Sequence, residues 1–150
     1  MSENTDLIKL YSGQILALAA DIPHTDRLTS PQATVKRRSP LCGSTVTVDL
    51  IMDGGRISEF GQDVKACALG QAAASVVGSA VIGCNEDEIR TAQSQLKAML
   101  KSDGPAPDAP FDALKVLLPA KEFRNRHASI MLALDATVEA MEQVRNANCA

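Results

Sequence analysis

The segment from Thr45 to Lys65 constrains the fold more than any other part of this 150-residue chain. From residue 45 to residue 52, valine, leucine or methionine alternates with threonine, aspartate or isoleucine. This period of two predicts a strand with one buried face. Asp53-Gly54-Gly55 is typical of a hairpin turn, because glycine tolerates a positive φ. A return strand is expected from Arg56 to about Lys65, with Gly61 marking a bulge. The sequence therefore predicts a β-hairpin.

The remaining patterns predict mostly helices. Residues 32–38 are expected to form a short edge strand, and residues 102–110 a linker. The expected helices are a first one capped by Asn4 or Thr5 and stopped by Pro23, a buried one over 68–83 ended by Gly83, one opened by an Asn85/Glu88 capping box, a short one from Asp112 to Leu118 ended by Pro119, and a last one from about Arg126. Strands thus come early and helices later, which predicts a single domain over residues 1–150 of the α+β class with a small antiparallel sheet.

The composition excludes several classes of function. Only 3% of the residues are aromatic, so stacking platforms for nucleic acid are not expected. The formal net charge is −3, which provides no general field for polyanions. No apolar run reaches the length of a membrane span, and Met1-Ser2-Glu3-Asn4 lacks the basic start of a signal peptide. We expect a cytoplasmic protein with reduced thiols and neither membrane nor nucleic acid as a partner.

Two of the four cysteines lie where a thiol would be presented rather than hidden. Cys42 follows Pro40-Leu41 and precedes Gly43 in an expected turn, and Cys67 lies where the return strand gives way to a helix. Unpaired N–H groups at a helix start favour a thiolate. Because a hairpin brings its two outer ends together, Cys42 and Cys67 are expected to be neighbours in space. Such a pair suits metal, sulfur or redox chemistry.

The other candidate residues carry weaker signals. His127, near the start of the last helix, would be a third ligand for zinc or iron, although a capping or surface histidine is the commoner case. Cys84 is expected to be half-buried, and Cys149 lies near the C-terminus. Lys36-Arg37-Arg38 is interpreted first as a solvated strand edge and second as a group of cations favouring the Cys42 thiolate or an acidic partner.

Two stretches carry a family resemblance. "SPLCGSTVTVDLIMDGGRISEFGQDVKACALGQAAASVV" (39–77) resembles the P-x-C-G-D segment, hairpin and G-C-x-x-x-x-A-S-S motif of the U-type iron–sulfur scaffold family, which comprises IscU, SufU and the N-terminal part of NifU. "RNRHASIMLALDA" (124–136) resembles its third motif, H-C-S-I-L-A. The resemblance implies the SufE/NifU-like fold, with a small antiparallel sheet and helices packed on one face.

The resemblance also implies a role and a ligand set. The chain would be an iron–sulfur cluster assembly scaffold or carrier that works with a cysteine desulfurase and recipient apo-proteins, and it would bind iron, a [2Fe–2S] cluster or zinc through Cys42, Cys67 and His127. Ser44 stands where the family has an aspartate ligand. Ala128 stands where the family has its third cysteine, and a register shifted by one residue places Ser129 there. With no third thiol, a cluster would need a further ligand from Cys84, Cys149, a small thiol or another chain, for instance in a homodimer.

Three alternatives accompany this hypothesis. The first is a non-catalytic adaptor that keeps the fold and docks on assembly partners without carrying a cluster. A structural zinc site is disfavoured because only three ligands can be named where four are usual. An enzyme is not expected, because nothing marks a substrate pocket around a Cys67–His127 pair.

Overall fold

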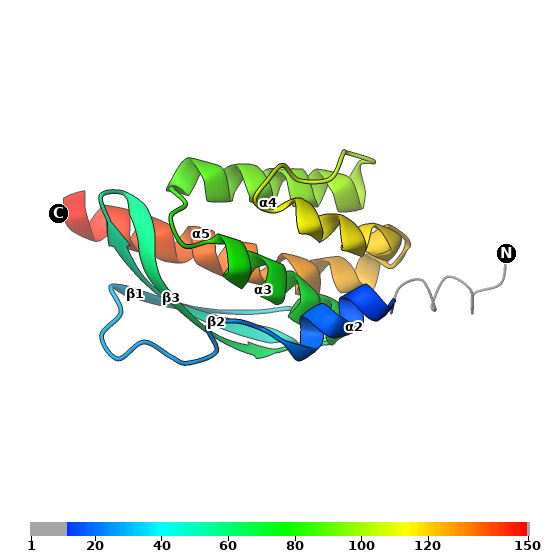
Figure 1. The fold of residues 1–150 in the computed structure, drawn as a ribbon, viewed down its shortest axis with the longest axis horizontal. Helices are drawn as coiled ribbons and strands as arrows, with labels where there is room; N and C mark the ends of the chain where they lie inside the picture. Colours follow the sequence, from blue (N-terminus) through cyan, green and yellow to red (C-terminus); the bar gives the residue numbers. More distant parts are fainter. Residues whose placement is uncertain (1–11, 150) are drawn as a thin grey trace, which may run out of the picture.

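The structure, a computed structural model, describes residues 12–149. The expected start of the first helix at Asn4 or Thr5 lies outside the described residues. In chain order the elements are α2 (Gly13–Ala20), β1 (Ala33–Arg38), β2 (Thr45–Asp53), β3 (Arg56–Lys65), α3 (Ala68–Ala80), α4 (Glu86–Lys101), the 3₁₀ helices η1 (Asp112–Glu122) and η2 (Arg124–Arg126), and α5 (His127–Cys149). Helices accompany an antiparallel sheet in the order β1-β2-β3, which confirms the α+β prediction (Figure 1).

The predicted hairpin is present, and its bulge lies elsewhere than expected. β2 pairs with β3 from Thr45↔Lys65 to Asp53↔Arg56. Gly54 and Gly55 turn the chain with φ values of +62° and +81°, a region that glycine enters without steric cost. The register shifts between Ile51 and Met52, which leaves Ser58 as the extra residue. The bulge expected at Gly61 is therefore wrong.

Gly61 has a different reason to be glycine. It pairs with Asp49, and a Cβ at this position would lie 2.7 Å from the carbonyl oxygen of Asp26 and 3.2 Å from the amide nitrogen of Leu28. The loop between α2 and β1 therefore crosses the sheet here in backbone contact with β3. Only a residue without a side chain allows that approach.

This crossing loop buries a carboxylate on the face of the sheet that the alternation assigns to solvent. Asp49 is fully buried and accepts hydrogen bonds from the Arg27 guanidinium, the Leu28 amide and the Thr34 hydroxyl. Burial raises the pKa of the Asp49 carboxyl, but these donors outweigh burial and hold the pKa below its ordinary value. The prediction of one buried face on β2 is therefore wrong around Asp49, because the loop covers its second face.

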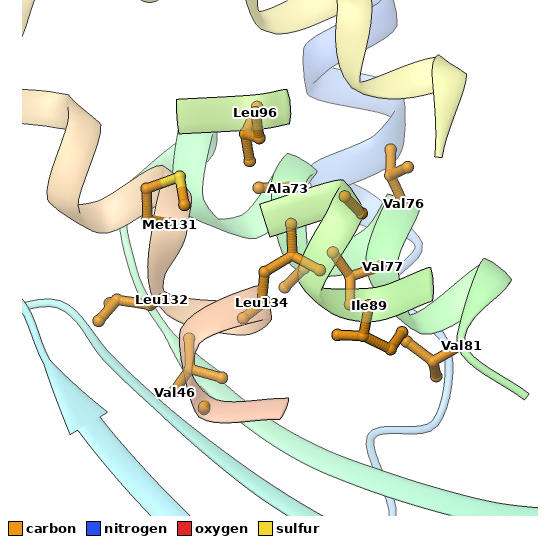
Figure 2. Packing of buried hydrophobic residues seen from close by; sticks show 14 of the residues in the cluster. Val46, Ala73, Val76, Val77, Val81, Ile89, Leu96, Met131, Leu132 and Leu134 are labelled. Carbon is orange, nitrogen blue, oxygen red and sulfur yellow. The ribbon is translucent and has the colours of Figure 1, made fainter. Parts of the chain in front are cut away.

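The helices form two layers over the other face of the sheet (Figure 1). α3 and α5 pack on the strands, and α4 packs on α5. Figure 2 shows side chains from β2, α3, α4 and α5 meeting in one apolar cluster, with Val46, Val77, Leu96 and Leu134 among them. These four side chains are almost fully buried, so the core lies between the layers.

The expected helices form, with two corrections. The capping box of α4 is confirmed by hydrogen bonds in both directions between Asn85 and Glu88. α3 ends at Ala80, three residues before Gly83, whose φ is +89°. The short helix expected to stop at Pro119 is instead the 3₁₀ helix η1, which contains Pro119 and runs to Glu122. Within the part of the chain that the structure describes, no helix combines the length and apolarity needed to cross a membrane.

Candidate thiol site

The hairpin holds Cys42 and Cys67 at the same end of the sheet. Thr45 pairs with Lys65, Cys42 precedes this pair by three residues, and Cys67 follows it by two. Side-chain contacts bring the β1–β2 loop, the start of α3 and the start of α5 together at this end. The two thiols therefore lie near the start of α5, which begins some sixty residues after Cys67 in the chain.

A closed turn presents Cys42. The Ser39 amide donates to the Ser44 carbonyl at 2.8 Å, and the Gly43 amide donates to the Ser39 carbonyl at 3.0 Å. Gly43 adopts a φ of +71°, which favours glycine. Cys42 is an exposed residue, while its Sγ lies 3.3 Å from Ser39 Oγ and 3.2 Å from Ser44 Oγ.

These contacts change the acidity of the thiol. Partial burial raises the pKa of Cys42, but hydrogen bonds from the hydroxyls of Ser39, Ser44 and Ser129 and from the Ser44 amide lower it further than burial raises it. The pKa is about 7 instead of 9. Since hydroxyl and amide donors stabilise the thiolate, a large fraction of Cys42 is ionised at neutral pH.

Ser129 joins the two thiols. Its hydroxyl donates to Ser44 Oγ at 3.1 Å and lies 3.6 Å from Cys67 Sγ. Ser44 and Ser129 are both buried, and Cys67 is partly buried as the N-cap residue of α3. A connected set of two thiols and two buried hydroxyls, which we call the thiol site, therefore consists of Cys42, Ser44, Cys67 and Ser129.

Gly70, in the first turn of α3, allows Ser129 to come this close. A Cβ at Gly70 would lie 2.5 Å from Ser129 Oγ and 2.8 Å from the Cβ of Ala66. Gly70 is not among the residues predicted for the site from the sequence. The only local signal for it is a glycine inside a helical pattern, which lowers helix stability unless packing requires it.

Replacing Gly70 with alanine is expected to destabilise the fold by about 1–3 kcal/mol through overpacking and to move Ser129 away from the thiols. The Gly78→Ala variant is the matched control, because its Cβ would meet Gln62 Nε2 at 2.6 Å, elsewhere in α3. Denaturant unfolding should report a lower free energy of unfolding in both variants. The alkylation rate of Cys42 should change only in Gly70→Ala. An equal effect of both variants on Cys42 would contradict this role of Gly70.

His127 lies on a different side of α5 from Ser129. Its Nε2 is 3.0 Å from the Ala120 carbonyl oxygen and 3.2 Å from that of Lys121, at the end of η1. Two residues along an α-helix correspond to a rotation of about 200°, so the faces of His127 and Ser129 point apart. The structure brings Cys42 and Cys67 together through serines and places the His127 ring nitrogen on carbonyl groups. Ligation by His127 stays a prediction.

The geometry also distinguishes the two registers of the third motif. Ala128 lines a cavity with Ser94, Lys97 and Met131, between α4 and α5. Ser129 instead contacts the thiol site. The residue beside the thiols is therefore Ser129, the residue that takes the third-cysteine position when the motif is shifted by one residue. Across residues 12–149, no three histidine, cysteine or acidic side chains are grouped so as to hold a metal ion.

The remaining predicted residues lie outside the thiol site. Cys84 is buried and donates to the Ala80 carbonyl at 3.2 Å; burial raises the pKa of its thiol. Lys36, Arg37 and Arg38 are exposed on β1, as expected for a solvated edge, and Arg37 forms an exposed ion pair with Glu139 at 3.0 Å. The cations are not needed to explain the Cys42 pKa, because hydroxyl and amide donors lower it.

Comparison with solved structures decides the family. The N-terminal NifU-like protein of Brucella abortus, described as nitrogen-fixing, matches with a TM-score of 0.92 and 40% identity over 94% of this chain and 98% of its own. The chain belongs to the U-type iron–sulfur scaffold family.

A more distant structure shows the same fold. SufU of Fervidobacterium islandicum AW-1, assigned as an iron–sulfur cluster assembly scaffold for the SUF system, matches with a TM-score of 0.80 and 18% identity over 89% of this chain and 98% of its own. Models of protein families give no match to this chain, and neither do curated proteins. Against the motifs of the U-type family, Ser44 stands at the aspartate position, and Ala128, or Ser129 in the shifted register, stands at the position of the third cysteine.

Replacing Ser44 with alanine is expected to raise the pKa of Cys42 above 7, because one hydroxyl donor to the thiolate is lost. The pH midpoint of Cys42 alkylation by iodoacetamide, followed by peptide mass spectrometry, measures this change. Ser58→Ala is the matched control, since the Ser58 hydroxyl contacts the Ile51 carbonyl near the other end of the hairpin. A midpoint that stays near pH 7 in Ser44→Ala would show that the serine does not set the acidity.

Proposed function

We propose that this protein is a scaffold or carrier in iron–sulfur cluster assembly, with its iron-containing cargo held by Cys42 and Cys67. The observation that carries the proposal is the thiol site: two cysteines at one end of the sheet, connected through Ser44 and Ser129, one of them with a pKa of about 7. Thiolates are the ligands that iron–sulfur clusters require. Membership of the U-type family supports the same role.

The two thiols could supply some of the ligands that such a cargo needs. Iron, a [2Fe–2S] cluster and zinc all accept thiolate ligands. Two thiols supply half of the four ligands that a [2Fe–2S] cluster usually has. The predicted third ligand, His127, would have to leave the carbonyl groups of Ala120 and Lys121 before its Nε2 could bind a metal.

The proposed partners follow from the cargo. A cysteine desulfurase would supply sulfur and recipient apo-proteins would accept the cluster, in the cytoplasm. Ser129 cannot carry a persulfide, so any sulfur taken up by the thiol site would be bound by a thiol of Cys42 or Cys67. The proposed role is one of binding and transfer.

Anaerobic reconstitution with ferric iron and sulfide tests the proposal. We expect thiolate-to-iron charge-transfer absorption and iron that stays with the chain through gel filtration. Reconstitution with zinc alone, followed by metal analysis, determines whether the same thiols prefer zinc. Absence of iron and of charge-transfer absorption, with and without a desulfurase and its cysteine substrate, would refute the cluster-carrying role.

The alternative is the adaptor. Ser44 and Ala128, which stand in place of two family ligands, favour it. An adaptor would retain its desulfurase or recipient partner in a pull-down after the Cys67→Ser substitution, and recipient maturation would be unchanged. A carrier would lose recipient maturation in the same variant.

A further inference from the structure

We propose that the groove between the end of α4 and the start of α5 is a docking site for an extended acidic segment of a partner protein. Lys97 and Lys101 of α4 are the cations that bind the carboxylates of this segment. The inference goes beyond the proposed function, because it involves neither thiol and applies to a carrier and to an adaptor alike. It follows from the polar pairs between the two helices, from the point where these pairs end, and from the length of the groove that begins there.

Polar pairs join α4 and α5 over the first part of their contact. As the chain advances along α4, the partner on α5 lies progressively earlier in the chain, so the two helices are antiparallel. Each pair joins one side chain of α4 to one of α5, and in order from the start of α4 the pairs are Glu86–Arg145, Arg90–Glu142 and Gln93–Asp135.

The pairs stop before the last two turns of α4. At the same helical spacing, the next α4 residues after Gln93 are Lys97 and Lys101, and both are exposed. On α5, the positions that precede Asp135 by four and seven residues are Met131 and Ala128, which have no carboxylate. Among residues 12–149, neither lysine belongs to an ion pair. The charges of the two lysines are therefore not compensated by α5.

A groove lies where the pairs are missing. One cavity, of about 490 Å³, is lined by Lys97, Lys101 and Ala128 among others. A second cavity, of about 560 Å³, shares Lys101 and His127 with the first and continues to Arg124. The two cavities therefore form one groove that follows the end of α4 and the start of α5.

The acids that line the groove lie on either side of the two α4 lysines. Asp135 is level with Gln93, whose amide donates to it at 2.8 Å. At the other end, Asp103 forms an ion pair with Lys121, and Glu122 lines the second cavity. Positive charge is therefore concentrated in the middle of the groove. An incoming carboxylate is favoured there, because opposite charges across an interface direct association and select the partner.

The length of the groove favours a segment of chain over a single small anion. From Ser94 to Lys101, α4 rises about 10 Å, which three residues of extended chain cover. Lys97 and Lys101 are about 6 Å apart along the helix axis. Side chains two residues apart on one face of an extended segment are about 7 Å apart. The lysines thus match a segment that has an acid at every second position.

Docking in the groove leaves the thiol site accessible. His127 lines the groove, whereas Ser129 contacts the thiols, and the two residues face different sides of α5. A partner bound along α4 therefore does not cover Cys42, which is exposed in its turn. The groove can hold a partner protein while the thiols take up or release cargo.

Amide chemical-shift titration of the full chain, labelled with ¹⁵N, tests the inference. The probe is the peptide Glu-Thr-Glu-Thr-Glu with both ends blocked. We expect saturable shifts at Lys97, Lys101 and Ala128, and weaker binding as salt rises from about 20 to about 200 mM. The permuted peptide Thr-Thr-Glu-Glu-Glu has the same charge and should bind several-fold more weakly. Inorganic phosphate should give no saturable shifts in the groove.

Charge reversal identifies the cations. The double variant Lys97→Glu/Lys101→Glu should bind the alternating peptide about tenfold more weakly or worse, because two attractions become repulsions. Lys36→Glu/Arg38→Glu is the matched control: both side chains are exposed on β1, the net charge changes equally, and binding should stay at the wild-type level. Ala128→Glu supplies a carboxylate from α5 itself and should also weaken binding.

Several results would overturn the inference. They are equal binding of the two peptides, an equal loss in both double variants, shifts confined to β1, saturation of the groove by phosphate, or no saturable binding. Saturation by phosphate would identify the occupant as a small anion. None of these results bears on the proposed function, which iron loading at the thiol site tests separately. Iron loading of Lys97→Glu/Lys101→Glu should equal that of the wild type.

Discussion

Replacing either Cys42 or Cys67 with serine is expected to lower the iron retained after reconstitution by more than about tenfold. Loss of a partner that merely orients a metal ligand already reduces affinity by about ten- to a hundredfold, and loss of the ligand itself should do more. The substitution is sterically mild at both positions. Cys42 is exposed in a turn, and Cys67 is the N-cap of α3, a position that serine favours.

Iron content per chain and charge-transfer absorption measure the effect. Cys149→Ser is the control for removing a thiol away from the thiol site, and its loading should equal that of the wild type. His127→Ala discriminates between ligand sets: unchanged loading supports the two thiols alone, and loss comparable to Cys42→Ser supports the predicted third ligand. Iron retained at the wild-type level by both cysteine variants would refute the proposed site.

Replacing Asp49 with alanine is expected to destabilise the fold by about 3 kcal/mol, which is large for one residue. The carboxylate is fully buried, and its removal leaves the Leu28 amide and the Thr34 hydroxyl without their acceptor. The Arg27 side chain is 48% exposed and can return to water, so the lower end of the range for broken buried pairs applies. Asp63→Ala is the control, because that carboxylate is partly exposed and lies 3.9 Å from Lys65.

The same carboxylate gives stability a pH dependence of known sign. The pKa of Asp49 is lower in the folded chain than its ordinary value near 4, so the unfolded chain binds the proton more readily. Its contribution is fully present above about pH 4 and is lost as the pH falls toward the folded pKa. In urea unfolding across this range, the free energy of unfolding should fall less steeply with decreasing pH for Asp49→Asn than for the wild type. An equal pH dependence in the two proteins would contradict the assignment.

The hairpin and its two thiols were predictable because their signals are local. Alternation and a Gly-Gly turn define the pairing, and the pairing alone brings Cys42 and Cys67 to one end of the sheet. The burial of Asp49 was not predictable in this way. Nothing within β2 shows that the loop carrying Arg27 crosses its outer face, and that long-range contact also accounts for Gly61. Local patterns predict the elements, while contacts between distant segments decide which polar residues are buried.

The helix α5 illustrates a second limit. Its apolar positions predict a helix, yet each step along a helix turns the side chain by about 100°. A one-residue uncertainty in the motif therefore exchanges His127, Ala128 and Ser129 between faces. The contact with Cys67 identifies Ser129, and Gly70 of α3 makes room for it. The spacing of apolar residues in one segment does not show which face of the helix a given residue occupies. It also does not show which other element packs against that face.

The Thr45–Lys65 pairing at the base of the hairpin has a consequence for how cargo is taken up and released. It fixes the separation of the two sulfur-bearing residues before any ligand arrives, and the apolar core is formed by the chain's own side chains without a ligand. Uptake therefore requires little ordering of the backbone, unlike small zinc domains that fold only around their ion. The empty chain should melt as a native protein, so repeated loading and unloading need not pass through an unfolded state.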